Sequence, residues 1–199
     1  MTRTAILLSG GMDSIALAYW KHPDVAYTID YGQASALGEF RAAGAVCRVL
    51  GIPQREIRVD CRSLGSGDLA GTEPNPQSPS SEWWPFRNQL LITLGAMQAM
   101  QDQVTVLLVG TVATDSFHRD GTKEFFDAAD GILRMQEGGL SVQAPAIHLT
   151  TAELVKASGV DAPMLAWAHS CHTSNLACGC CRGCCKHRSV MTELGHGSY

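Results

Sequence analysis

The sequence lacks any apolar run long enough to cross a membrane, and it lacks an excess of basic residues. Its longest apolar stretches have the length of strands or short helices, whereas a transmembrane helix needs about 20 consecutive apolar residues. The formal net charge is −4, so a broad nucleic-acid-binding surface is not expected. The apolar run near the first residue is too short for a signal peptide. We therefore expect a cytoplasmic protein that binds neither membranes nor nucleic acid directly.

Charged residues are also few. They make up 17% of the 199 residues, while hydrophobic residues make up 45%. This balance is typical of a folded chain and excludes a largely disordered one. The length suits one domain with a sizeable core, or a domain with a small appendage.

Cysteine is scarce over most of the chain and dense near one end. Two cysteines precede position 171, and six more fall within the fifteen residues from Cys171 to Cys185. A disulfide framework normally spreads its cysteines through a small secreted chain. A dense cluster without a secretion signal is more typical of a metal site.

The spacing within the cluster suggests a ligand set. Cys171, Cys178, Cys181 and Cys184 form the pattern C-x6-C-x2-C-x2-C. Four thiolates make a closed tetrahedral zinc site, which stabilises structure and leaves no open position for chemistry. Because Cys180 and Cys185 lie beside these residues, either could replace a neighbour as a ligand. The sequence thus predicts Zn²⁺ but leaves the exact ligand set open.

Candidate strands and helices alternate along the chain. The expected strands are Thr4–Leu8, Val25–Asp30, Arg55–Asp60, Val104–Gly110 and Val142–Leu149, and the expected helices are Ile15–Trp20, Ala34–Leu50, Pro85 to about Met100, 122–136 and a short one from Thr151. The alternation predicts an α/β fold with a mostly parallel sheet and helices on both faces. Residues 63–82, rich in Ser, Gly and Pro, are expected to form a loop. In such folds, ligands bind beyond the carboxyl ends of the strands.

A glycine-rich turn follows the first expected strand. It reads Ser9-Gly10-Gly11-Met12-Asp13-Ser14 and leads directly into a helix. The glycines allow the backbone to approach a phosphate closely, and the helix start offers unpaired N–H groups. The serine hydroxyls add donors, and Asp13 could order the loop or help to hold Mg²⁺. On the Gly-Gly pair alone, an ordinary turn would be the better interpretation.

The complete six-residue turn resembles the Ser-Gly-Gly-x-Asp-Ser signature of the PP-loop ATP pyrophosphatases. That resemblance implies cleavage of ATP between its α and β phosphates and transfer of AMP to a substrate oxygen.

Further segments, in order along the chain, are similar to one family within this superfamily, 7-cyano-7-deazaguanine synthase. The matching segments are Ser9–Ser14, Asp30–Gln33, Pro85–Asn88, Gly110 with Asp115, Asp120 with Glu124-Phe125, Ser170-Cys171 and Cys178–Cys184. Each intermediate segment is weak by itself, but their order and spacing make the set specific.

The resemblance implies a fold, a reaction and cofactors. The fold would be a Rossmann-like ATP-binding domain over residues 1–160, with a zinc-binding segment over 161–199. The reaction would convert 7-carboxy-7-deazaguanine and ammonia to the nitrile, consuming two ATP with Mg²⁺ and passing through adenylates. The product is a precursor of queuosine. A homodimer is expected.

The resemblance also assigns roles to individual residues. The catalytic candidates are Asp13, Ser14 and Arg87, and the nucleotide or substrate candidates are Leu8, Ser9, Gly10, Gly11, Met12, Asp13, Ser14, Tyr31, Gln33, Asn88, Gly110, Asp115 and Asp120. The guanidinium of Arg87 suits a phosphate or carboxylate, although a surface salt bridge is the simpler interpretation. Asp115 and Asp120 could accept N–H bonds from a purine-like edge, or they could be solvated loop residues.

Departures from the family pattern cluster on the substrate side. Ala34-Ser35 replace the usual Arg-His, Gly121-Thr122 fall where Cys-Arg is usual, and Thr151 stands where Lys is common. The ATP-binding residues look intact. An alternative is therefore a diverged ligase that activates a deazaguanine carboxylate or another acid and joins it to a different amine, such as the N-terminus of a protein partner. A zinc-bearing binding module without catalysis is disfavoured by the intact turn and Arg87.

Overall fold

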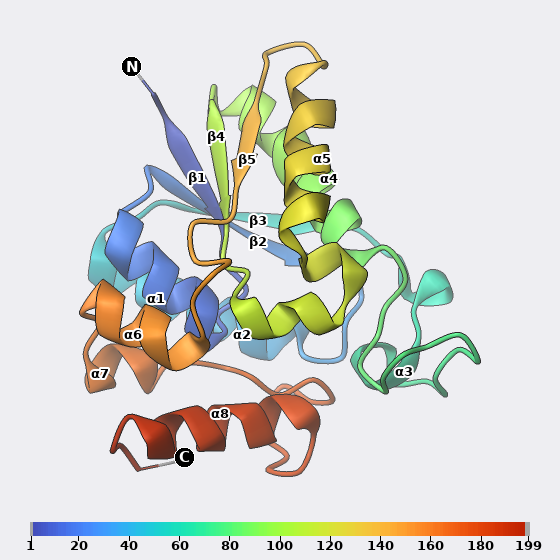
Figure 1. The fold of residues 1–199 in the computed structure, drawn as a ribbon, viewed down its shortest axis with the longest axis vertical. Coiled ribbons are helices and arrows are strands. Elements are labelled where there is room, and N and C mark those ends of the chain that lie inside the picture. Colours follow the sequence, from blue (N-terminus) through green and yellow to red (C-terminus); the bar gives the residue numbers. More distant parts are fainter. Residues whose placement is uncertain (1, 198–199) are drawn as a thin grey trace.

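The computed structural model describes residues 2–197 and contains a five-stranded parallel sheet in the order β3-β2-β1-β4-β5 (Figure 1). The strands are β1 (Thr4–Leu7), β2 (Val25–Asp30), β3 (Gln54–Arg58), β4 (Val106–Val109) and β5 (Ser141–Gln143). This arrangement confirms the predicted α/β fold class.

Helices connect the strands and cover the sheet. They are α1 (Met12–Lys21), α2 (Ala36–Leu50), α3 (Gly67–Ala70), α4 (Arg87–Gln101), α5 (Lys123–Arg134), α6 (Thr151–Ser158), α7 (Ala162–Leu165) and α8 (Arg182–Glu193). Among residues 2–197, no helix combines the length and apolar character needed to span a membrane.

The central strand β1 supplies both halves of the core because its side chains alternate between the faces of the sheet. Ile6, and Leu8 directly after the strand, pack with buried residues of α1, α2, α6, α7 and α8. Ala5 packs on the opposite face with Ile92 of α4 and Phe126 of α5. The sheet is therefore buried on both faces, as expected for parallel strands in an α/β protein.

One predicted strand is wrong over most of its length. The range Val142–Leu149 was expected to be extended, but β5 ends at Gln143. Pro145 has no backbone N–H to donate to a neighbouring strand. The chain instead turns twice, with the Ile147 N–H donating to the Ala144 carbonyl and the Leu149 N–H to the Ala146 carbonyl. These turns lead to α6, the short helix expected from Thr151, where Thr150 and Glu153 form a capping box.

The predicted loop 63–82 is largely irregular, but it contains α3 and part of a short 3-10 turn at Arg62–Leu64. Its far end is anchored by Trp84, which is 3% exposed and meets the Tyr31 ring edge-on with centroids 4.8 Å apart. Trp84 therefore serves as a hydrophobic anchor for this loop.

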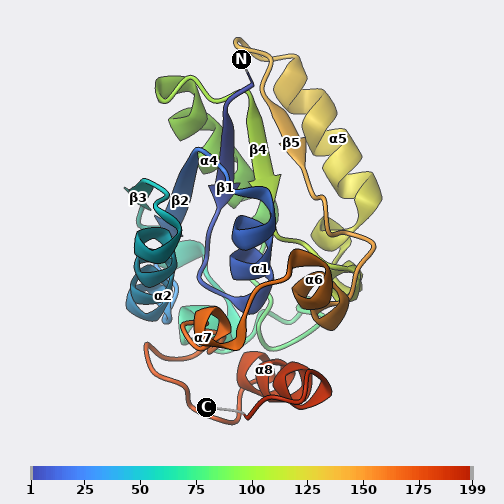
Figure 2. The ribbon, with the colours of Figure 1, turned by 90° about the vertical axis from the view of Figure 1, so that its left-hand side faces the viewer.

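The C-terminal segment crosses the end of the molecule toward which the strands point. In both ribbon views α8 lies beyond the carboxyl ends of the sheet (Figures 1 and 2). Val190 and Met191 of α8 join the same core cluster as α1 and α6. Residues 198 and 199 of the predicted segment 161–199 lie outside the described residues. Neither α7 nor α8 was anticipated as a helix from the sequence.

Candidate functional site

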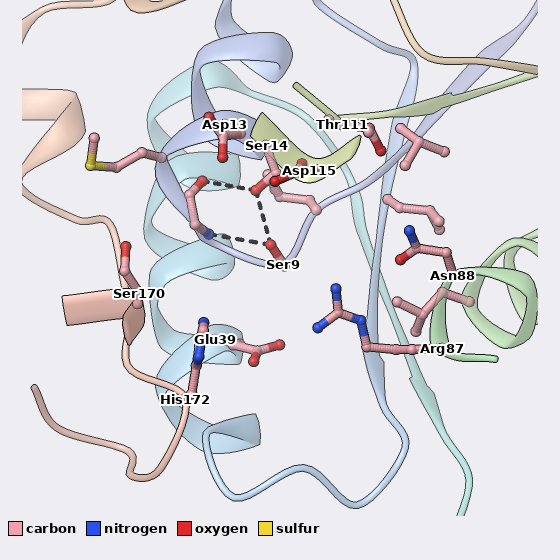
Figure 3. Close-up of a pocket in the computed structure, with 18 of the residues that line it drawn as sticks. Ser9, Asp13, Ser14, Glu39, Arg87, Asn88, Thr111, Asp115, Ser170 and His172 are labelled. Carbon is pink, nitrogen blue, oxygen red and sulfur yellow. Dashed lines mark hydrogen bonds between the residues drawn. The ribbon is translucent and has the colours of Figure 1, made fainter. Parts of the chain in front are cut away.

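The sheet creates a crevice beside β1. The chain runs from β1 outward through β2 and β3 in one direction, and β4 and β5 lie on the other side. The connections after β1 and β4 therefore diverge at their carboxyl ends, which is the switch point where ligands bind in open α/β sheets. A cavity of about 310 Å³ lies there, lined by both connections, the start of α4 and the C-terminal segment (Figure 3). This size lies within the range of small-molecule sites.

The turn Ser9–Ser14 forms one wall of the cavity and is held by its own hydrogen bonds. The Gly11 N–H donates to Ser9 Oγ at 3.3 Å, Ser14 Oγ donates to the Gly11 carbonyl at 2.9 Å, and the two hydroxyls lie 3.2 Å apart (Figure 3). No side chain caps the start of α1. The first N–H groups of this helix are therefore open to an anion, and the helix dipole favours one.

Two glycines have a packing role at this wall. Gly10 has a φ of +78°, and a Cβ there would lie 2.7 Å from the Ala42 Cβ, so the turn can pass close to α2 only without a side chain. A Cβ at Gly110 would lie 3.0 Å from the Ser14 Cα. The connections after β1 and β4 thus approach each other directly. Gly10 itself does not line the cavity, although Gly11 and Gly110 do.

Arg87 faces the turn from the opposite wall, at the first residue of α4 (Figure 3). Burial lowers the pKa of Arg87, but Tyr31 and the nearby carboxylates outweigh it and raise the pKa. The guanidinium is permanently charged in any case. The structure therefore places it in the cavity rather than in the surface salt bridge that was its simpler interpretation.

Glu39 shares this wall and was not among the predicted site residues. Burial raises its pKa, while hydrogen bonds from Ser35 at 2.6 Å and Gln33 at 2.9 Å act in the opposite direction. Gln33, which was predicted to shape the wall, lies behind it. Its side chain accepts from the Tyr31 N–H and donates to Glu39 and to the Ile29 carbonyl. Gln33 thus positions Glu39 and Tyr31, which line the cavity.

Asn88 and Asp120 bind each other at the start of α4. The Asn88 N–H donates to Asp120 Oδ2 at 3.2 Å, and the Asn88 amide donates to the Asp120 carbonyl at 2.7 Å. Asp115 accepts from the Val112 N–H at 3.1 Å. All three line the cavity, but part of their hydrogen-bonding capacity already holds the loops that form it.

A lysine that sequence reasoning missed reaches Asp13. Lys186 Nζ of α8 lies 3.0 Å from Asp13 Oδ2 and 3.7 Å from Asp115 Oδ1. Burial raises the pKa of Asp13, and the ammonium opposes that rise. The available signal was position: Lys186 follows Cys184 by two residues, within the segment expected to be pinned by metal.

The four predicted cysteine ligands come together at the start of α8. The Sγ atoms of Cys171, Cys178, Cys181 and Cys184 all lie within 4.8 Å of one another. Two of the separations, Cys171 to Cys181 and Cys178 to Cys184, are 3.9 Å. Backbone N–H groups of His172, Cys181 and Cys184 donate to these sulfurs. The arrangement suits a single metal ion, because N–H donors stabilise thiolates.

Comparison with known proteins gives a consistent set of matches. Residues 3–195 match the family model described as queuosine biosynthesis protein QueC. The 7-cyano-7-deazaguanine synthase of Campylobacter fetus subsp. fetus is 28% identical over 92% of this chain and 90% of its own. The synthase of Methanothermobacter thermautotrophicus is 28% identical over 97% of this chain and 96% of its own, and that of Pseudomonas aeruginosa is 29% identical over 92% and 90%.

Two solved structures share the fold at low sequence identity. The U34-tRNA thiolase NcsA of Methanococcus maripaludis, solved with its [4Fe-4S] cluster, has a TM-score of 0.54 and 17% identity, covering 97% of this chain and 65% of the thiolase. The NMN synthetase of Francisella tularensis has a TM-score of 0.50 and 16% identity, covering 99% of this chain and 79% of the synthetase. These likenesses establish the fold alone.

Proposed function

The chain belongs to the QueC family of queuosine biosynthesis proteins, and from that membership we propose that it converts 7-carboxy-7-deazaguanine and ammonia to 7-cyano-7-deazaguanine at the expense of ATP. One structural observation supports the proposal independently of the family assignment. A single cavity is bordered by the uncapped start of α1, the hydroxyls of Ser9 and Ser14, and Arg87. That combination suits a nucleotide triphosphate beside a second anionic reactant.

The two opposite walls of the cavity would bind different reactants. The N–H groups after Gly11 and the serine hydroxyls would bind the phosphates of ATP, because they converge on one side of the cavity (Figure 3). Arg87, on the other side, would orient the substrate carboxylate or the transferred phosphate by paired hydrogen bonds. Apolar residues such as Ile29, Leu91 and Val109 also line the cavity and would receive the flat bases.

The substrate carboxylate must be activated by ATP because a carboxylate is a poor acyl electrophile. One carboxylate oxygen attacks the α phosphorus of ATP, and pyrophosphate leaves. Ammonia then attacks the acyl carbon, AMP departs, and an amide results. In a second round the amide oxygen attacks the α phosphorus of another ATP, and pyrophosphate leaves again. Loss of AMP and of the two amide protons then gives the nitrile. Arg87 and the α1 N–H groups would stabilise the negative charge that develops at phosphorus.

Mg²⁺ is expected to accompany the triphosphate. Asp13 and Asp115 are the carboxylates placed to hold it, since both line the cavity beside the phosphate turn. When bound, the ion offsets phosphate charge.

We assign the cysteine site to Zn²⁺. A tetrahedral ion with bonds of about 2.3 Å sets its thiolates about 3.8 Å apart, close to the 3.9 Å of two of the sulfur pairs, and all four sulfurs lie within 4.8 Å of one another. An iron–sulfur cluster would spread its cysteines further, because each binds a different iron atom. Cys171, Cys178, Cys181 and Cys184 would hold the ion as a structural site.

A second candidate, the diverged ligase, is favoured by the loop beside the cavity that contains Gly121. A Cβ at Gly121 would lie 2.2 Å from the Asp115 carbonyl oxygen, so a larger residue at this position would require a different path of the loop. Because the neighbouring Asp120 lines the cavity, such a difference would reach the acceptor side. In this alternative, the adenylate is formed as above but a different amine attacks it.

Mass spectrometry of one reaction tests both candidates. Purified protein is incubated with Mg²⁺, ATP, 7-carboxy-7-deazaguanine and ammonium. Nitrile together with AMP and pyrophosphate is the expected result. Accumulation of adenylate or amide without nitrile would reject the synthase and favour the ligase. Absence of any AMP would reject both. The expected homodimer and cytoplasmic location stay predictions.

A further inference from the structure

The ATP site has few fixed positive charges. The turn Ser9–Ser14 contains no lysine or arginine, unlike phosphate-binding loops that include a lysine. Among the described residues that line the cavity, Arg87 and Lys186 are the arginine and lysine side chains. They come from different ends of the fold, the start of α4 and the middle of α8.

Lys186 is the cation on the phosphate side. Its ammonium contacts Asp13, which belongs to the turn itself, and faces Asp115 from the connection after β4. An ammonium group has three donors, and the Asp13 contact at 3.0 Å uses one of them. The side chain is 38% exposed and lines the cavity, so its ammonium is accessible to a ligand there.

The cysteine site sets where Lys186 lies. Cys181 caps α8, and its Sγ accepts the Cys184 N–H, so two of the metal ligands form the first turn of this helix. Lys186 follows on the second turn. A Cβ at Gly183 would lie 1.9 Å from the Ser170 carbonyl oxygen, which shows how closely this first turn is packed against the segment that contains Cys171.

Thr151 gives a second, independent indication. It is 3% exposed and lines the cavity, and its side chain is among the groups that lower the pKa of Asp13. Position 151, where lysine is common in the family, therefore lies beside the same carboxylate as Lys186, but in this chain it is an uncharged threonine. In this chain the ammonium that accompanies Asp13 comes from α8 and not from α6.

We propose that Lys186 is a phosphate-binding residue of the ATP site, positioned by the cysteine-held start of α8. The inference rests on the proposed use of ATP. Asp13 and Asp115 hold the ammonium beside the turn, and a triphosphate oxygen then competes for its donors. The two carboxylates are thereby released for Mg²⁺. The cysteine site thus has a role in substrate binding as well as in stability.

The first test compares Lys186→Met with the wild-type holoprotein, with Lys156→Met as the matched control. Lys156 is an exposed lysine of α6 outside the cavity. Binding of α,β-methylene-ATP with Mg²⁺ and binding of adenosine are each measured by calorimetry, with metal content measured alongside. Loss of a charge-assisted hydrogen bond should weaken binding of the triphosphate analogue about 10–100-fold. Adenosine affinity and metal content should not change, and Lys156→Met should bind both ligands as wild type does.

Equal affinity of Lys186→Met and wild type for the analogue would overturn the proposal. So would an equal loss for adenosine, because a merely structural defect affects both ligands. If Lys186→Met fails to fold, a second measurement on the wild type decides. Acetylation of Lys186 by an amine-reactive ester should be slowed by α,β-methylene-ATP with Mg²⁺ and not by adenosine, while acetylation of Lys156 is unaffected. Absence of this protection would reject the proposal.

Failure of the Lys186 proposal can be distinguished from failure of the proposed synthase reaction. A wild-type protein that binds the analogue but forms no nitrile would refute the synthase reaction and leave the role of Lys186 open to the same measurements. A wild-type protein that does not bind the analogue would refute both.

Discussion

The phosphate turn and the cysteine segment border the same cavity but are held in place by different means. The turn lies between β1 and α1, where Leu8, Met12 and Ile15 are 1%, 4% and 0% exposed. The segment 168–181 contains neither helix nor strand. The turn is therefore shaped by the hydrophobic core beneath it, whereas we expect the segment to depend on an ion shared by the four thiolates.

This difference in support shows that a small domain can form one site from a segment held by the core and a segment held by clustered cysteines. A core-supported turn keeps its shape without a ligand, because its neighbours are packed on several sides. Four clustered thiolates without an ion would lose the interaction that brings them together, since the binding energy of such a site is also folding energy. The comparison predicts that perturbing the two regions will have separable consequences.

Removing one thiolate should have the largest effect. Cys184 is 0% exposed, and Cys184→Ser should lose the metal. Structural zinc sites in small peptides are worth about 10–16 kcal/mol. Even a third of that corresponds to a fall of roughly 10 °C in Tm for a chain of this length. Metal analysis and scanning calorimetry test this, with Cys61→Ser, outside the segment, as the control. Retained metal at an unchanged Tm would reject the ligand set.

Removing the carboxylate of the turn should separate function from stability. Asp13→Ala is expected to lower AMP formation at least about 100-fold, in the range seen when a single electrostatic contact is lost from an active site. Burial already raises the pKa of Asp13, which means that its charge is unfavourable in this position, so Tm and metal content should change little. Asp127→Ala, at an exposed pair on α5, is the control. Undiminished AMP formation would disprove the assignment of this turn.

A methyl group in the turn should test its dependence on packing. Gly10→Ala needs a φ of +78° and places its Cβ 2.7 Å from Ala42. Strain of about 1–2 kcal/mol from the left-handed backbone, together with about 1–3 kcal/mol from overpacking, is expected to lower Tm. Gly51→Ala is a matched control, because its φ is +68° but no atom lies within 4 Å of the added Cβ. The metal should be retained in both variants. Equal melting temperatures would show that contact with α2 does not constrain the turn.

Both regions could be predicted from the sequence. The strands and the turn were found because their signals are local: an apolar run, two glycines and a helix start. The cysteine spacing likewise sufficed for the four sulfurs that come together. In both cases neighbouring residues carry enough information.

What escaped prediction depends on distant contacts. Lys186 is separated from Asp13 by 173 positions, and its place two residues after Cys184 does not by itself reveal that it reaches the turn. Glu39 was missed for a different reason: it lines the cavity, and Gln33, six positions earlier and behind the wall, donates to it and to the Ile29 carbonyl. The overlong strand at 142–149 arose from apolar composition, which outweighed the local evidence of Pro145.

The smallest effect is expected from a cysteine that lies beside the ligand set. Cys180 is exposed, and its Sγ lies 3.7 Å from that of Cys178, but it is not among the four whose sulfurs converge. Cys180→Ser should therefore keep one metal per chain, with Tm within about 1–2 °C of wild type, as is typical of a surface substitution. Cys178→Ser provides the matched comparison, because it alters a neighbouring exposed thiolate that does belong to the set. If Cys180→Ser loses metal while Cys178→Ser keeps it, the two have exchanged roles. The segment would then be shaped by a different thiolate from the one that its geometry indicates.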